Sequence, residues 1–185
     1  MTVLFVSPQP ADAAGPWHGQ VIDAETGKPL EGVVVLATWW KHFASVGGWS
    51  NGKLYDSEEV VTDAEGRFAI KSRWLINWFP LLSEIRGPQL YVFKPGYGKW
   101  RFQGEEEWLK LEIGERGARK EEALREFEHG TVIIELPPLK TEERLGTIDI
   151  DPYGRIPDSK MPRFLEALDQ ERVLRGRPPL PRHDK

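Results

Sequence analysis

Hydrophobic residues in the middle of the chain form short runs separated by turn-forming residues. The clearest runs lie at 19–23, 33–40, 60–62, 67–70, 90–93 and 131–136. Val, Ile, Phe and Trp dominate them, and Gly, Pro and Asp stand between them, as is typical of β-strands and their turns. No regular helical pattern alternates with these runs. The sequence therefore predicts an antiparallel β-sandwich.

The turn between 60–62 and 67–70 reads Asp63-Ala64-Glu65-Gly66. An Asp at the start and a Gly at the end favour a hairpin, because the carboxylate can bond the turn backbone and Gly tolerates positive φ. The same residues are faintly similar to a calcium loop, but the other ligands of the twelve-residue pattern are absent. A hairpin is the simpler interpretation.

Three motifs occur in a familiar order. They are Gly19-x-Val21-x-Asp23-x-x-Thr26-Gly27-x-Pro29-Leu30-x-Gly32-Val33-x-Val35, Thr62-Asp63-x-x-Gly66-x-Phe68 and Pro95-Gly96-Tyr97. Together they resemble carboxypeptidase regulatory-like domains, over residues 17–103 and 131–138. The resemblance implies a seven-stranded Greek-key sandwich of the transthyretin-like (prealbumin-like) fold. It also implies an exported protein without catalytic activity, because that family is mostly non-catalytic.

Relative to the plain family domain, the chain carries additions. We expect a sandwich at 17–140, with insertions at about 41–57, 72–87 and 104–130. A C-terminal extension follows at 141–185, with a short helix at about 160–174 that docks on this domain or on a partner. Removing 141–185 is expected to leave a folded sandwich.

The N-terminal segment 1–16 contains Ala11-x-Ala13, the small-residue pattern that signal peptidases cleave, after a short apolar run. The basic residues that normally precede such a run are missing, so the segment is read as a signal-peptide remnant or a disordered N-terminus. This pattern predicts a periplasmic or extracellular protein. No stretch approaches the ~20 apolar residues that span a bilayer.

Two insertions show helical spacing. Trp74 and Trp78 stand four residues apart, as do Leu75 and Phe79, which predicts a short amphipathic helix before the next proline. The runs at 33–40 and 90–93 are apolar on both faces, so one outer face needs a cover. We expect the segment 74–85 to provide it. A second, solvated helix is expected at 118–128, with Leu124 and Phe127 turned inward.

Composition narrows the chemistry. The chain has 185 residues, no cysteine and a net charge of −4. The absence of cysteine excludes disulfides and thiolate sites, and the acidic balance argues against nucleic-acid binding. The four histidines show no metal-ligand spacing, and no nucleophile or phosphate-binding motif occurs. We therefore expect no enzymatic activity, no metal and no cofactor.

Two enzyme families share the transthyretin-like or a related sandwich. Hydroxyisourate hydrolases end in Tyr-Arg-Gly-Ser, whereas this chain ends in Arg182-His183-Asp184-Lys185. Intradiol dioxygenases bind iron with two Tyr and two His. Tyr91 and Tyr97 are present here, but no His-x-His pair accompanies them. Neither activity is expected.

Eight tryptophans remain as the most unusual feature. The first hypothesis is a non-catalytic module, an accessory subunit of a larger envelope complex, that binds a protein partner. Its candidate contact residues are Trp40, Trp49, Trp74, Trp78, Phe164 and Leu168. The alternative is a carbohydrate-binding module in which Trp40, Trp49 and Tyr55 stack on sugars, with His42 or Asn51 as polar partners. Membrane contact through Trp74, Trp78 and Phe79 is expected to be peripheral at most.

Overall fold

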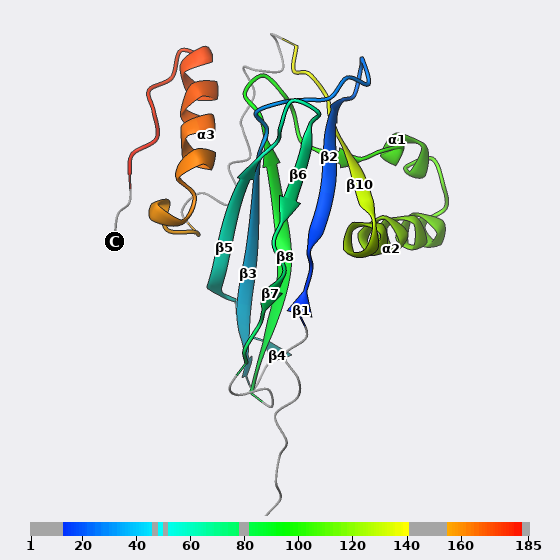
Figure 1. The fold of residues 1–185 in the computed structure, drawn as a ribbon, viewed down its shortest axis with the longest axis vertical. Helices are drawn as coiled ribbons and strands as arrows, with labels where there is room; N and C mark the ends of the chain where they lie inside the picture. Colours follow the sequence, from blue (N-terminus) through cyan, green and yellow to red (C-terminus); the bar gives the residue numbers. More distant parts are fainter. Residues whose placement is uncertain (1–12, 46–47, 50–51, 78–81, 141–154, 183–185) are drawn as a thin grey trace, which may run out of the picture.

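The structure, a computed structural model, describes residues 13–45, 48–49, 52–77, 82–140 and 155–182. This part of the chain is mostly β-sheet with a few helices (Figure 1). Two four-stranded sheets share one core between their facing sides, an arrangement consistent with a β-sandwich.

The first sheet runs in the order β6, β2, β10, β9. Its strands are β6 (Arg67–Ile70), β2 (Trp17–Asp23), β10 (Thr131–Leu136) and β9 (Arg101–Phe102). β10 runs parallel to β2, and the other neighbours are antiparallel. Alternate residues of β2, β6 and β10 are buried, as expected for strands with one face on a core.

The second sheet is built around the long strand β3 (Val34–Ser45). β5 (Lys53–Val61) and β8 (Ser83–Phe93) pair with β3 on its two edges, both antiparallel. β4 (Gly48–Trp49) pairs with the end of β3. A separate short pair joins β1 (Ala13–Ala14) to β7 (Arg73–Trp74).

Large apolar side chains fill the space between the sheets. Trp17 of the first sheet and Trp39 of the second are both buried, with ring centroids 5.8 Å apart. Two helices precede β10: α1 (Glu105–Trp108) and α2 (Ile113–His129). α2 contacts β2 and β10, and its buried residues in this core are Ala123 and Phe127. Leu124 is 49% exposed, so the expectation that it turns inward is wrong; Ala123 takes that position.

A second core covers the outer face of β3. Val34, Leu36 and Trp40 lie there, because they alternate with the inward-facing residues of the strand. The C-terminal segment packs on them through a 3₁₀ turn, η2 (Asp158–Lys160), and the helix α3 (Pro162–Leu174). Figure 1 shows α3 lying beside β5 and β3, on the side away from the first sheet.

The expected cover for this face, the segment 74–85, is therefore wrong. In that segment Trp74 is 71% exposed, Ile76 49% and Leu82 64%. The helix α3 presents Phe164, Leu165 and Leu168 on one side, and this apolar stripe meets the apolar outer face of β3.

Hydrogen bonds fix α3 at both ends. The Glu59 carboxylate accepts the backbone N–H groups of Phe164 at 2.7 Å and Arg163 at 3.1 Å, at the N-terminus of the helix. Near the other end, buried Glu171 accepts the Gly96 N–H at 2.6 Å and pairs with Arg175 at 2.7 Å. Removing this segment would expose the second core to water, so the expectation that the sandwich stays intact without it does not fit the packing.

The first two expected insertions contain strand residues. Within 41–57, residues 41–45 and 53–57 belong to β3 and β5, which pair with each other. Residues 72–77 are extended, with β7 in place of the first part of the expected helix; 78–81 lie outside the described residues.

Among the described helices, none is long and apolar enough to cross a membrane.

Candidate interaction surface

One end of the second sheet extends beyond the first sheet. Trp39 faces Trp17, the first residue of β2, so the part of β3 that follows Trp39 passes the start of that strand. We call this part of the molecule the distal end. Within the described residues it comprises 41–45, 48–49, 53–55, 73–77 and 82–86.

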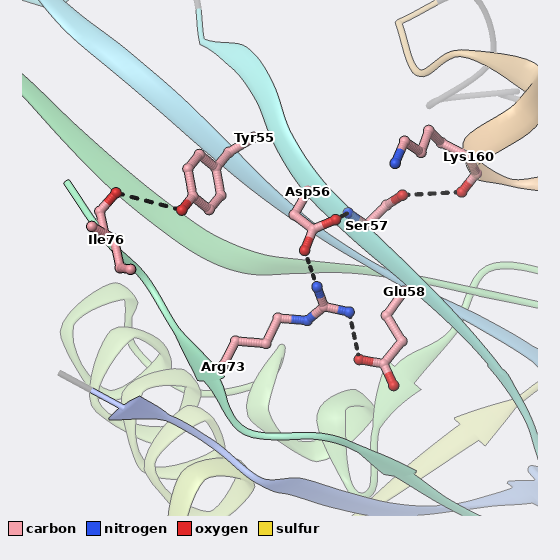
Figure 2. A network of polar contacts seen from close by, with 7 residues as sticks. All are labelled: Tyr55, Asp56, Ser57, Glu58, Arg73, Ile76 and Lys160. Atoms are coloured by element: carbon pink, nitrogen blue, oxygen red, sulfur yellow. Dashed lines mark hydrogen bonds and ion pairs between the residues drawn. The ribbon is translucent and has the colours of Figure 1, made fainter. Parts of the chain in front are cut away.

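A network of partly buried polar side chains holds residues 73–77, which follow β6, against the distal half of the second sheet (Figure 2). The Arg73 guanidinium lies 4.6 Å from the centroid of the Trp39 ring. It also forms ion pairs with the carboxylates of Asp56 and Glu58, the latter at 2.9 Å. Stacking on the ring and pairing with two carboxylates together fix the direction of the Arg73 side chain.

The register of β5 explains why two carboxylates meet one arginine. Asp56 lies opposite Trp39 and Glu58 opposite Ala37, so both carboxylates point toward the first sheet. Partial burial lowers the pKa of Arg73 from its ordinary value. The two carboxylates and the Trp39 ring offset the cost of burying that charge, because each interacts favourably with a cation.

Hydrogen bonds hold the rest of this segment, residues 75–77, in place. The Tyr55 hydroxyl donates to the Ile76 carbonyl at 3.4 Å. The Asn77 amide donates to the Ser83 carbonyl at 2.6 Å, and the Ser83 hydroxyl donates back to the Asn77 side chain at 2.8 Å. Because Arg73 and Leu75 face the sheet, the alternate residues Trp74 and Ile76 face solvent.

Large apolar side chains at the distal end are exposed. We call Phe43, Trp74, Ile76 and Leu82 the distal apolar patch; their exposed fractions range from 44% to 71%. Several exposed apolar side chains at one end of a molecule mark an interaction site more often than scattered single residues do.

Two lysines stand beside the patch. Lys41 and Lys53 are directly opposite each other on β3 and β5, and the Lys41 ammonium lies 5.6 Å from the centre of the Phe43 ring. Like charges directly across a pair of strands destabilise a sheet, so this arrangement costs the fold free energy. An acidic group on a bound partner would remove that cost.

The candidate contact residues divide into three groups. Trp74 belongs to the distal apolar patch. Trp40, Phe164 and Leu168 are 7%, 4% and 2% exposed, and the interpretation of these three as exposed contacts is corrected: β3 and α3 bury them against each other. Trp78 and the Trp49 side chain lie outside the described residues.

For the carbohydrate alternative, Tyr55 is 39% exposed, whereas Trp40 is buried under the guanidinium of Arg155, 5.1 Å from its ring centroid. Asn51 lies outside the described residues. The sequence does not single out Phe43, Ile76 and Leu82 as candidate contact residues. The apolar residues at 74–82 stand out in the sequence, but their pattern predicts a cover for the sheet.

The described residues contain no group of three or more His, Asp or Glu side chains arranged to hold a metal ion. The acidic turn at Asp63 serves the backbone instead. Its carboxylate accepts the N–H groups of Glu65 at 3.1 Å and Arg67 at 2.7 Å, which closes the hairpin between β5 and β6.

Comparison with protein-family models, with curated proteins and with solved structures finds no match to this chain.

Proposed function

We propose that this protein is a non-catalytic, exported interaction module that serves as an accessory subunit of a larger cell-envelope complex. The observation that carries the proposal is the distal apolar patch. The Arg73 network and the Asn77–Ser83 hydrogen bonds hold Trp74 and Ile76 outward at 71% and 49% exposure. A rigidly held tryptophan is a favourable contact for a protein partner, because little side-chain entropy remains to be lost on binding.

The chemistry of the patch describes the partner. An apolar centre on the partner would bury Trp74 and Leu82, and acidic side chains around it would face Lys41 and Lys53. Such a surface combines the apolar core and the polar rim of ordinary protein interfaces. Electrostatic complementarity of this kind favours the correct orientation and a faster association.

The proposal includes a carboxypeptidase regulatory-like domain with Greek-key, transthyretin-like topology, located in the periplasm or outside the cell. Its support is the two-sheet core together with the turn glycines of the three motifs. Gly27, Gly66 and Gly96 have φ of 68°, 70° and 87°. Residues other than Gly rarely adopt these backbone angles, which gives a physical reason for glycine in each motif.

The test is quantitative co-purification from native envelopes in mild detergent. We expect a stoichiometric protein companion with the wild-type chain and at least a tenfold loss of it with Trp74→Ala/Leu82→Ala, since interface tryptophans are often worth 2 kcal/mol or more (roughly 30-fold). The matched control is Ile113→Ala/Leu124→Ala, which removes exposed apolar side chains from α2. Equal capture by all three proteins would refute the proposal.

A lipid surface is the competing occupant. Sedimentation with vesicles of phosphatidylglycerol and phosphatidylcholine would detect it. Wild-type sedimentation that is lost in Trp74→Ala/Leu82→Ala, without a protein companion, would assign the patch to membrane rather than to protein. The glycan alternative keeps only Tyr55 as an exposed ring of its set among the described side chains, and no other observation favours it.

A further inference from the structure

The chain turns back on itself after α3. Gly176 follows the end of the helix with φ of +69°, a left-handed conformation that favours glycine. The next N–H, of Arg177, donates to the carbonyl of Arg172 in the last turn of the helix at 2.8 Å. The segment 177–182 therefore runs back beside α3, as Figure 1 shows in red.

Contacts at both ends hold this segment against α3. The Arg172 guanidinium donates to the Pro178 carbonyl at 2.6 Å. The Asp169 carboxylate accepts the Leu180 N–H at 2.7 Å and pairs with Arg182. The Leu180 side chain is buried in the second core. The prolines of the segment are thus fixed to the domain.

Three prolines restrict the backbone of the segment. The sequence reads Arg177-Pro178-Pro179-Leu180-Pro181, so every one of these residues is a proline or precedes one. Proline fixes its own φ at about −65°, and the residue before a proline is shifted away from helical angles toward extended ones. The segment belongs to no helix or strand. These restrictions favour the polyproline II conformation.

The exposed side of the segment consists of proline rings. Leu180 is 8% exposed, whereas Pro178, Pro179 and Pro181 are all exposed. A polyproline II helix has about three residues per turn, so Leu180 faces the domain while the rings lie on the other sides. We call these three exposed residues the proline ridge.

The backbone of the ridge offers a partner no N–H donor. Among residues 177–181 only Arg177 and Leu180 have a backbone N–H, and these donate to the Arg172 carbonyl and the Asp169 carboxylate. Pairing with a strand of a partner would require such donors. The ridge is therefore suited to recognition through its rings, the mode in which polyproline II segments bind aromatic-lined grooves.

One arginine adds a charge at the start of the ridge. Arg172, Arg175 and Arg182 contact acceptors within the C-terminal segment. Arg177 is exposed and directly precedes the first proline of the ridge. A carboxylate on a partner would pair with this guanidinium and fix the direction in which the ridge lies in a groove.

We propose that the proline ridge binds a groove on a protein partner, lined by Trp or Tyr rings and carrying a carboxylate that faces Arg177. Because the contacts to α3 already order the segment, little conformational entropy is lost on binding. The proposal rests on the proposed role as an interaction module. It does not depend on the distal apolar patch, whose residues belong to other segments of the chain.

Quantitative co-purification from native envelopes tests the ridge with the variant Arg177→Ala/Pro179→Ala. We expect roughly tenfold less companion protein than with the wild-type chain, because both the charge and one ring of the contact are lost. The matched control is Pro162→Ala/Arg163→Ala, which removes the same two residue types from exposed positions at the start of α3. It should capture as much companion as the wild type, and thermal melts show that both variants are folded.

The outcomes separate the ridge from the distal apolar patch. Equal capture by the folded ridge variant, its control and the wild type would overturn the ridge, even where Trp74→Ala/Leu82→Ala loses the companion and supports the patch. Loss with the ridge variant alone would support the ridge and refute the patch.

Cross-linking tests the chemistry of the partner's groove. The chain has no cysteine, so Leu174→Cys provides a single attachment point for a photoreactive maleimide. Leu174 is 61% exposed and lies three residues before Arg177. After irradiation in native envelopes we expect an adduct with the companion, at a surface that combines Trp or Tyr with Asp or Glu. No adduct, or an adduct at a surface without aromatic residues, would overturn the proposal.

Discussion

Replacing Phe164 with alanine tests whether the C-terminal helix is part of the hydrophobic core. The Phe164 ring is 4% exposed and lies 5.7 Å from the Phe93 ring and 6.4 Å from the Tyr91 ring. A buried phenylalanine removes roughly 150 Å² or more from water, worth about 4 kcal/mol at about 25 cal/mol per Å². Measured losses for such substitutions in cores are about 3–5 kcal/mol.

The assay is urea unfolding followed by tryptophan fluorescence, with Val173→Ala as the control. Val173 lies on the same helix but is 60% exposed, so its substitution should change the free energy of unfolding by less than about 0.5 kcal/mol. A loss of about 3–5 kcal/mol should lower the melting temperature by roughly 10 °C in a chain of this size. If Phe164→Ala and Val173→Ala unfold alike, α3 is not packed on β3 in solution, and the second core is refuted.

Two further predictions concern single carboxylates. Glu59→Ala should lower the free energy of unfolding in urea by about 1 kcal/mol, because it removes the acceptor for the first N–H groups of α3. The control Glu166→Ala, on the exposed side of the helix, should lower it much less, and equal effects would contradict the capping role. For Asp23, burial raises the pKa, but hydrogen bonds from the turn backbone and the Tyr97 hydroxyl outweigh burial and hold it below its ordinary value. The ionised Asp23 therefore stabilises the fold above about pH 4, and this contribution is lost as the pH falls through the lowered pKa of the folded state. The difference in free energy of unfolding between wild type and Asp23→Asn should shrink from pH 6 to pH 2. A constant difference would contradict this assignment.

The sequence predicted the class of fold because strand patterns are local. Alternating apolar residues and turn glycines are sufficient to place β2, β6 and β10. It also predicted that the outer face of β3 needs a cover, since Val34, Leu36 and Trp40 alternate with an equally apolar inner row. Choosing the cover was not possible from pattern alone, because 74–85 and 160–174 are both amphipathic and the choice depends on contacts distant in sequence.

The candidate sites were harder to predict for the same reason. In place of the first part of the helix expected around Trp74, residues 72–77 are extended, and Arg73 there pairs with two carboxylates of β5 that lie 15 and 17 positions earlier in the chain. A β-bulge in β8, where Gly87 and Pro88 lie opposite the single residue Trp39, reverses the facing of every later position relative to the rest of β8, and no periodicity shows where such an extra residue falls. Single-residue shifts of this kind decide which side chains are available for binding.

The position of α3 after all the strands in the sequence affects how the protein folds during synthesis. Glu59 and the Phe164 N–H that it binds are 105 residues apart, so the outer face of β3 leaves the ribosome long before its cover. At about 5–20 residues per second this delay lasts roughly 5 to 20 s. During that interval Val34, Leu36 and Trp40 form an exposed apolar row on a strand, which is prone to aggregation. Translation speed and chaperone binding between the synthesis of Glu59 and that of Phe164 should therefore govern the yield of folded protein more strongly than the same factors acting before Glu59 is made.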